Sequence, residues 1–591
     1  MRRFLQVFCP FFSGVALALA IPNELLPFGA PLIAVFSLLP FYVALSRAKS
    51  YASAFVSGWI LAFTAHLLSS FWLGNFRGFA FFTLGASALG TGFVCAFSAL
   101  VFYFPFSHCR TERRLQENAG MTAYSLPLRV FWFAGTYTVW EWAKSFGFLA
   151  YPWGTLSMTA YTWPLVTQIA DLTGPYGVTF LFALVSAAMG EGVLLIPRLA
   201  HAAQKTSLYD DWLRCVRTCA ALIAVTVLYG AYQYLMPRVP VKTLNAVLVQ
   251  QNLDPWDDSD EEAIAISTRL SREKIDEFSE RGLRCDLVVW SEAVLSRNFP
   301  NAQHYYSYFP QNDPLIPFIR KMQTPFIIGA PFTINREKHQ YGNATVLLDK
   351  NGEYRGAYLK MHLVPFAERI PFVEYEAVRT FIRKIAGFSY GWVQGTVPVL
   401  FEIPLSTPPH HTANAPEIVS LTEQDQTRRQ SVFVSTPICF DDAFGEVCRA
   451  LYLAGSEAFI NLTNDAWSRT KSAEIQHFAV ASYRAIEYRT TLARSTNGGY
   501  TAVIDPAGRI LQSLPLFEEG ALAAEIPVYA RTMTIYARLG DWLIALLALL
   551  ALAYIVLFTI TERENRVTTI STELIRVKQR RGRPRKDEIR P

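Results

Sequence analysis

Long uncharged stretches dominate the first 240 residues of the chain. A helix of about 20 apolar residues spans the roughly 30 Å hydrocarbon core of a bilayer. The pattern therefore predicts seven membrane-spanning helices, followed much later by an eighth. The seven segments are residues 4–23, 25–46, 51–76, 78–107, 129–150, 175–196 and 215–236, and the eighth is 542–560.

Between residues 240 and 535 charged residues return and the apolar runs shorten to strand length. Strand-like runs alternate with helical patterns at 261–281 and 473–494, and the second of these has arginine and glutamate opposite its apolar face. Alternating strands and helices predict an α/β domain whose sheet core is covered by helices. The predicted strands are 244–249, 286–290, 325–329, 344–348, 432–438, 457–462 and 501–504.

These patterns divide the chain into four parts. We expect a membrane domain over 1–238, an α/β domain over 239–536, the eighth span over 537–561 and a basic tail over 562–591. Within the second part, 405–430 has loop composition and no periodicity, which predicts an inserted surface loop. Its neighbouring His410 and His411 are interpreted as solvated side chains and not as a metal site.

Basic residues mark one side of the predicted bundle, as they do in the cytoplasmic loops of membrane proteins. The opposite loops contain almost none, apart from Arg77. We therefore expect both chain ends in the cytoplasm and the α/β domain outside. The basic loop residues are Arg2, Arg3, Arg47, Lys49, Arg110, Arg113, Arg114, Arg198, Lys205 and Arg214.

The composition narrows the class of protein further. Hydrophobic residues make up 51% of the chain and charged residues 17%, which excludes intrinsic disorder. Eight cysteines in 591 residues exclude a disulfide scaffold. The net charge of +6 gives no indication of nucleic-acid binding, and we interpret the basic tail as attracted to anionic lipid head groups.

Three residues with complementary chemistry follow predicted strands in the α/β domain. They are a carboxylate at Glu292, an ammonium at Lys360 and a thiol at Cys439. In α/β sheets, functional groups converge at the carboxyl ends of the strands. A carboxylate can accept the thiol proton, the thiolate can attack a carbonyl, and the ammonium can stabilise the oxyanion. The three groups are therefore sufficient for acyl transfer.

The words around these residues resemble a known family. W-S-E-A at 290–293, K-x-H-L-V-P-F-x-E at 360–368, P-I-C-F-D at 437–441, N-D-A-W at 464–467 and A-R-S-T-N-G-G at 493–499 occur in this order. This series resembles the carbon–nitrogen hydrolase (nitrilase) superfamily, whose Glu-Lys-Cys triad matches Glu292, Lys360 and Cys439. With the eight predicted spans, the chain is similar to the membrane branch of that superfamily, the apolipoprotein N-acyltransferases.

The resemblance implies a fold, a reaction and a location. The α/β domain would be a nitrilase-like αββα sandwich on the periplasmic side of the bacterial cytoplasmic (inner) membrane. Cys439 would take a fatty acyl chain from a phospholipid as a thioester and pass it to the N-terminal α-amino group of a diacylated apolipoprotein. No metal or other cofactor and no nucleic acid is required, and we expect a monomer.

The resemblance also assigns supporting residues. Glu368 would orient Lys360 or assist proton transfer. Asn464 would position the backbone of the site. Trp256 and Trp467 would lie on the side that the substrate approaches. Phe440 and Asp441 stand where the family usually has Tyr and Glu, which puts in doubt any role that needs the phenol hydroxyl or the longer carboxylate.

Two other functions stay open at this point. One is a membrane-tethered amidase that uses the same triad with water as the acceptor. The other is a transporter with an outer binding domain, which would favour polar groups repeated through the bundle and an inverted repeat. The sequence shows neither beyond Glu141 and Lys144, which we expect to pair on one face of the fifth span.

Overall fold

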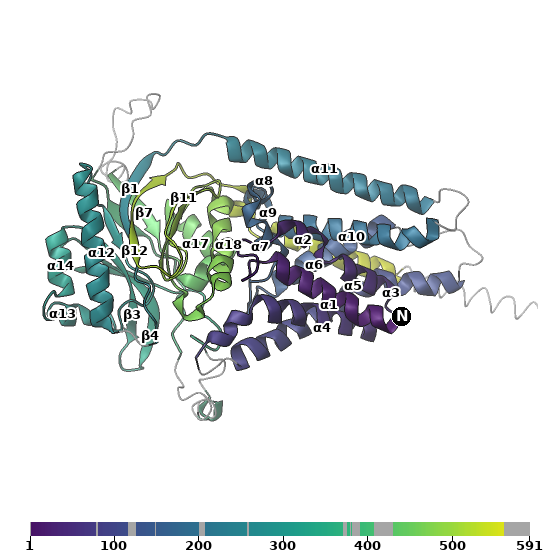
Figure 1. Ribbon diagram of the computed structural model, residues 1–591, viewed down its shortest axis with the longest axis horizontal. Coiled ribbons are helices and arrows are strands. Elements are labelled where there is room, and N and C mark those ends of the chain that lie inside the picture. Colours follow the sequence, from purple (N-terminus) through teal and green to yellow (C-terminus); the bar gives the residue numbers. More distant parts are fainter. Residues whose placement is uncertain are drawn as a thin grey trace, which may run out of the picture.

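The computed structural model describes the chain apart from residues 1, 78–80, 116–125, 148, 200–206, 257–258, 370–374, 379, 381–390, 407–429 and 561–591. Most of the predicted insertion at 405–430, with its two histidines, and the predicted basic tail lie outside the described residues. The molecule is elongated, with a helical bundle at one end and two β-sheets at the other (Figure 1).

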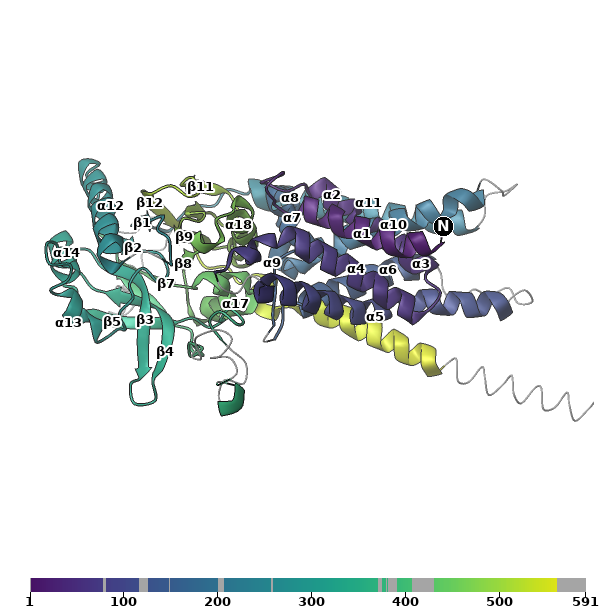
Figure 2. The same ribbon diagram turned by 60° about the horizontal axis from the view of Figure 1, so that its bottom comes forward.

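Apolar helices form the bundle. The helix Trp542–Ile560 runs beside α5 (Figure 2), where Tyr554 contacts Phe104 and Trp132. The long helices are α1 (Arg2–Ala20), α4 (Tyr51–Ser69), α5 (Ser87–Leu115), α6 (Leu126–Ala143), α10 (Tyr176–Leu199) and α11 (Ser207–Leu235), and the short ones are α2 (Pro31–Ser37), α3 (Leu39–Arg47), α7 (Leu156–Thr159), α8 (Pro164–Thr167) and α9 (Ala170–Thr173).

Five of the described helices are long and apolar enough to cross a membrane. Four belong to the N-terminal part and the fifth is Trp542–Ile560, where only 6% of the apolar window is buried inside the molecule. Such an exposed apolar surface faces lipid in a membrane protein. The chain is therefore an integral membrane protein. The full count of eight spans stays a prediction, because the apolar segments Leu5–Ala20 of α1 and Pro31–Arg47 of the α2–α3 pair are shorter, and α6, which carries Arg129 and Glu141, is not among the five.

Glu141 and Lys144 form no ion pair with each other among the described residues; both bind the segment that follows α6, and Glu141 also binds α10. Glu141 accepts hydrogen bonds from the Leu156 N–H (2.9 Å) and the Thr179 hydroxyl (2.7 Å). Lys144 Nζ donates to the Trp153 carbonyl oxygen at 2.7 Å. The two charged side chains thus fix the loop that contains Trp153, and this ring stacks on Phe440 of the sandwich.

Two six-stranded mixed sheets pack face to face. Parallel pairing joins β1–β2–β3 in one sheet and β7–β8–β9 in the other. The first has the order β12 (Gly520–Val528), β1 (Lys242–Gln250), β2 (Leu287–Val289), β3 (Phe326–Asn335), β4 (Gln340–Leu348), β5 (Tyr354–Leu359), and the second the order β11 (Ile510–Ser513), β10 (Ala502–Ile504), β9 (Thr491–Asn497), β8 (Ala458–Asn464), β7 (Ser431–Ser435), β6 (Phe401–Pro404).

Strand alternation distributes the side chains between two cores. In β1, Leu244, Ala246 and Leu248 join the core shared with the second sheet, whereas Val247 and Val249 pack on the opposite side. Helices α12 (Asp260–Glu280), α13 (Ala302–Tyr306) and α14 (Leu315–Met322) cover the first sheet, and α17 (Gly445–Ala454) and α18 (Lys471–Tyr488) cover the second (Figures 1 and 2). This is the predicted αββα sandwich.

The predicted helix at 473–494 is too long. Helix α18 ends at Tyr488 because Arg489 adopts a left-handed conformation, with φ 49°. The next residues form β9, which pairs in parallel with β8 from Thr491 to Asn497. The word A-R-S-T-N-G-G therefore lies in a strand and the turn after it, and not at the end of a helix.

Helix α18 lies between the sandwich and the bundle, and its residues from Ser472 to Tyr488 are all buried. The bundle covers the face that carries the polar residues. Gln476 Nε2 donates to the carbonyl oxygens of Pro22 (2.7 Å) and Ser69 (2.9 Å), and the Tyr483 hydroxyl donates to the Ser157 carbonyl oxygen (2.6 Å). The polar side chains opposite the apolar face of this helix are therefore buried as well.

We expect Arg489→Met to lower the thermal unfolding temperature of the detergent-solubilised protein. The Arg489 guanidinium, 6% exposed, lies 2.7 Å from the Asp171 carboxylate of α9 and also donates to Gln168. Removing one partner of such a buried pair costs about 3–5 kcal/mol. The control Arg355→Met changes a side chain that is 53% exposed, and it should lower the unfolding temperature much less because exposed ion pairs contribute little to stability. Equal unfolding temperatures for the two variants would contradict the buried junction.

Candidate active site

The three residues of the predicted triad follow three different strands. Glu292 comes three residues after β2, Lys360 directly after β5, and Cys439 opens the 3₁₀ turn η5 (Cys439–Ala443) after β7. Lys360 Nζ lies 3.0 Å from Glu292 Oε1, and both side chains are buried. The charges of Glu292 and Lys360 both act on the Cys439 thiol. The structure thus brings together residues that are up to 147 positions apart in the sequence, from 292 to 439.

Local backbone geometry holds two of these side chains in place. Cys439 has φ 45°, a left-handed conformation that is uncommon for a residue with a side chain and often marks functional sites. Glu292 lies in a loop that crosses closely over β3. A Cβ atom on Gly329 of β3 would lie 2.4 Å from the Ser291 carbonyl oxygen, so this crossing requires glycine.

Glu368 joins the cluster on the other side of Lys360. Its Oε2 lies 2.9 Å from Lys360 Nζ and accepts a hydrogen bond from the Val364 N–H at 2.8 Å. Asn343 of β4, which the sequence did not indicate, donates one amide group to both Glu292 (2.8 Å) and Glu368 (2.9 Å). One ammonium and one amide therefore hold the two carboxylates together.

Burial and neighbouring charges set the protonation of the three groups. Burial alone would lower the pKa of the Lys360 ammonium, but Glu292 and Glu368 raise it well above its usual value. Burial raises the pKa of the Glu292 carboxyl, although Lys360 opposes this. Burial and Glu292 raise the pKa of the Cys439 thiol well above its usual value. The resting site thus holds a neutral thiol, a charged ammonium and a carboxylate that is a stronger base than usual.

Asp441 ties the Lys360 loop to the Cys439 turn. Its carboxylate accepts hydrogen bonds from the His362 N–H (2.6 Å), the Ile438 N–H (3.1 Å) and the Tyr358 hydroxyl (2.8 Å). Burial raises the pKa of Asp441, and Lys360 and these donors offset only part of the rise. The resulting pKa is about 7. The shorter carboxylate at this position therefore connects two functional segments.

Asn464 positions Glu292 through its backbone. The Asn464 N–H donates to Glu292 Oε2 at 3.0 Å, and its side-chain oxygen accepts a hydrogen bond from Asn497 at 3.1 Å. Together with Lys360 and Asn343 on the other oxygen, this occupies both oxygens of Glu292. The orientation of the carboxylate is thus fixed from three directions.

Aromatic rings connect the site to the loops of the bundle. Phe440, next to Cys439, stacks on Trp153 with ring centroids 5.4 Å apart. Trp256 and Trp467 lie further out and meet through Phe76, at 5.2 and 5.5 Å from its ring centroid. Trp256 is 40% exposed. The two tryptophans therefore form part of an aromatic rim and not of the charged cluster.

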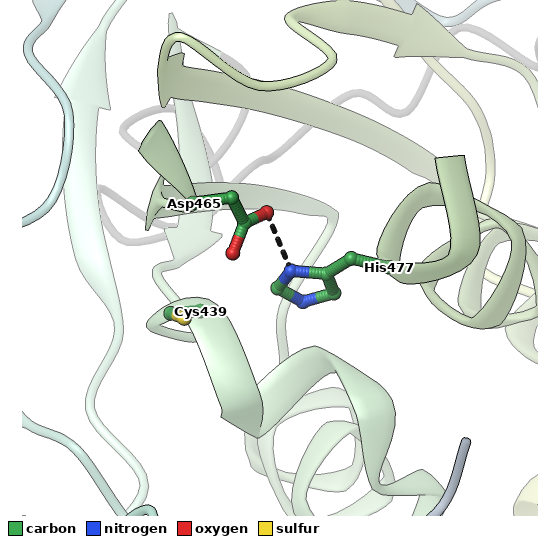
Figure 3. Close-up of side chains that lie close together, drawn as sticks. All are labelled: Cys439, Asp465 and His477. Carbon is green, nitrogen blue, oxygen red and sulfur yellow. Dashed lines mark hydrogen bonds and ion pairs between the residues drawn. The ribbon is translucent and has the colours of Figure 1, made fainter. Parts of the chain in front are cut away.

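A second set of groups lies beside Cys439 (Figure 3). The Cys439 thiol, an Asp465 carboxylate oxygen and a His477 ring nitrogen lie within 4.8 Å of one another, a spacing at which a metal ion could bind. However, His477 Nδ1 lies 2.7 Å from Asp465 and Nε2 lies 2.9 Å from Asp442. Both nitrogens thus donate to carboxylates, and the ring offers no lone pair to a metal.

The fold and this site together define a membrane-embedded protein with a carbon–nitrogen hydrolase domain. A family model described as carbon–nitrogen hydrolase matches residues 249–534, and one described as apolipoprotein N-acyltransferase N-terminal domain matches residues 13–188. The chain is also similar along most of its length to proteins of Treponema and Borreliella.

Apolipoprotein N-acyltransferase 2 of Treponema denticola is 39% identical over 92% of this chain and 95% of its own length. Apolipoprotein N-acyltransferase 2 of Treponema pallidum is 37% identical over 96% of this chain and 97% of its own. The apolipoprotein N-acyltransferase of Borreliella burgdorferi is 28% identical over 96% and 98%. The chain belongs to the apolipoprotein N-acyltransferase family and is an acyltransferase.

We expect stability to fall at alkaline pH through His477. Burial lowers the pKa of this imidazole, but Asp465 and Asp442 raise it further, to about 10 against the ordinary 6.5. The protonated ring thus stabilises the fold fully below pH 6.5, and this contribution is lost as the pH rises towards 10, by about 1.4 kcal/mol per pH unit.

Thermal unfolding between pH 7 and 10 measures this loss. The unfolding temperature of the unmodified protein should fall more steeply with pH than that of His477→Gln. The exposed His304→Gln variant should keep the original slope. Identical slopes for His477→Gln and the unmodified protein would show that the ring is neutral.

Proposed function

We propose that the protein transfers a fatty acyl chain from a membrane phospholipid to the N-terminal α-amino group of a diacylated apolipoprotein, through a thioester on Cys439. The observation that carries this proposal is the buried Lys360, which is held between Glu292 and Glu368 and whose charge acts on the Cys439 thiol. Family membership supports the choice of substrates.

The first half-reaction makes the acyl-enzyme. Glu292 accepts the thiol proton, and the Cys439 sulfur attacks the ester carbonyl carbon of the phospholipid. Lys360 faces the negative charge that develops on the carbonyl oxygen. Collapse of the tetrahedral intermediate breaks the bond to the glycerol oxygen, which takes the proton from Glu292 and leaves as a lysophospholipid. The raised pKa of Glu292 suits both proton transfers.

The second half-reaction forms the amide. The neutral α-amino group of the apolipoprotein attacks the thioester carbonyl carbon, the carbon–sulfur bond breaks, and Cys439 returns to the thiol. Water would compete for the same carbon unless the site excludes it. The stacked rings of Phe440 and Trp153 place apolar surface beside the turn, which supports amide formation over hydrolysis.

The sandwich stands on the periplasmic side of the membrane in this proposal. Helix α3, which ends at Arg47, and the N-terminus lie at the end of the bundle away from the sheets (Figure 1). Basic residues of this kind favour the cytoplasmic side. The sandwich, at the other end, would then face the compartment where exported apolipoproteins are displayed.

We expect Cys439→Ala to form neither an acyl adduct nor an acylated peptide when incubated with phospholipid and a diacylated peptide. Glu292→Gln should acylate roughly 10²–10⁴-fold more slowly, because it loses the base. Mass spectrometry before and after hydroxylamine treatment measures the adduct. Glu353→Gln, at a side chain 57% exposed, is the matched control.

Amide formation by Cys439→Ala at the normal rate would refute the thioester mechanism. Release of free fatty acid without amide by the unmodified protein would favour a membrane-tethered amidase. Transport activity that survives Cys439→Ala would favour a transporter with an outer binding domain.

Labelling in intact cells tests the orientation. Lys338→Cys lies at the tip of the β3–β4 hairpin of the sandwich, and Lys49→Cys follows α3, and both positions are exposed. A maleimide that cannot cross the inner membrane, added to cells whose outer membrane has been permeabilised, should label Lys338→Cys and not Lys49→Cys. Labelling of the unmodified protein gives the background. The reverse pattern would place the sandwich in the cytoplasm.

A further inference from the structure

A row of buried charged side chains ends beside Cys439. These side chains are separate from the Glu292–Lys360 pair. Arg494 of β9 is ion-paired with Asp442, Asp442 Oδ1 accepts from His477 Nε2 at 2.9 Å, and Asp465 Oδ2 accepts from His477 Nδ1 at 2.7 Å. The row therefore runs from Arg494 through Asp442 and His477 to Asp465; Figure 3 shows its last two members beside Cys439. None of these four residues takes part in the triad.

The charges alternate in sign along the row. A guanidinium, a carboxylate, an imidazolium and a carboxylate follow one another, and the side chains are 0%, 0%, 3% and 10% exposed. Buried charges are tolerated when each is paired and hydrogen-bonded in this way. The first three members are enclosed by their neighbours, so the terminal carboxylate is the member that can meet a substrate.

One carboxylate oxygen of Asp465 is available to accept a hydrogen bond from a substrate. Its Oδ2 binds His477, while its Oδ1 accepts no hydrogen bond from the part of the chain that the structure describes. A carboxylate oxygen of Asp465 lies within 4.8 Å of the Cys439 thiol. An acyl group on this sulfur would thus have a fixed carboxylate close to its carbonyl carbon.

Glu292 is less suited to receive a cation. Its oxygens accept hydrogen bonds from Lys360, Asn343 and Asn464. Asp465 Oδ1, by contrast, accepts no hydrogen bond from the described residues. The Asp465 side of Cys439 therefore offers a carboxylate oxygen to which a positively charged acceptor can donate.

We propose that Asp465 binds the α-ammonium group of the apolipoprotein and removes one of its protons before the nitrogen attacks the Cys439 thioester. His477, Asp442 and Arg494 are positioning residues that hold the carboxylate. This inference rests on the proposed function and adds to it a separate base for the second half-reaction.

The protons balance in this scheme. The acceptor arrives as an ammonium, gives one proton to Asp465, and attacks as a neutral amine. The carbon–nitrogen bond forms, the carbon–sulfur bond breaks, and the nitrogen loses its second proton to the departing sulfur by way of Glu292. The products are a neutral amide and the Cys439 thiol, and Asp465 releases its proton to solvent.

The test compares two acceptors on the same acyl-enzyme. Purified full-length protein is acylated with phospholipid, and the thioester is then consumed either by a diacylated peptide or by hydroxylamine, which is a neutral nucleophile at pH 7. In Asp465→Asn we expect peptide acylation to slow by about 10²-fold or more relative to hydroxylaminolysis. Asp313→Asn, at a surface side chain 55% exposed, is the matched control and should keep the original ratio.

Both rates, peptide acylation and hydroxylaminolysis, are measured on the same acylated protein. Their ratio therefore does not change when a variant merely contains less folded protein. Asp465→Ser is measured in the same way if the asparagine variant does not fold. An unchanged ratio in the folded variant, whether both rates stay normal or both fall, would overturn the role of Asp465. Failure of the unmodified protein to form any hydroxylamine-labile adduct would instead overturn the proposed function.

Discussion

Burial of one ammonium group constrains the whole site. Lys360 is 1% exposed, and a charge so far from water is stable only among counter-charges. Glu292 and Glu368 supply them, and Asn343 then holds the two carboxylates against mutual repulsion. Because these residues come from β4 and from the loops that follow β2 and β5, the need to neutralise Lys360 also fixes how these segments meet. Burial of the same site raises the pKa of the Cys439 thiol and of the Glu292 carboxyl, so the thiol is neutral at rest and Glu292 is a stronger base than an exposed glutamate.

Helix α18 connects this site to the membrane. One face carries His477, which hydrogen-bonds Asp465 and Asp442, and another carries Gln476, which binds carbonyl oxygens of the bundle. The turn with Cys439 also touches the bundle, through the stacking of Phe440 on Trp153. The bundle is thus more than an anchor, since its loop at Trp153 contacts the turn that carries the thiol.

The sequence was a good guide where local pattern determines structure and a poor one where distant segments cover each other. The seven predicted strands, the helix at 261–281 and the convergence of Glu292, Lys360 and Cys439 follow from apolar runs and strand ends. The helix predicted at 473–494 is present up to Tyr488, and the prediction was wrong beyond that residue because Arg489 ends the helix in a left-handed conformation. Asn343 was missed because an isolated asparagine in a strand has no pattern, and Asp465 and His477 because their partnership joins a loop to a helix.

A single hydrophobic core runs through both halves of the molecule. It includes Leu17 and Phe133 of the bundle, Val434 and Ile460 of the second sheet and Ala524 of the first. Separate domains usually keep separate cores, which lets them rotate about a linker. Rotation of one half against the other would have to break this shared core, which favours access to Cys439 through movements of side chains and loops.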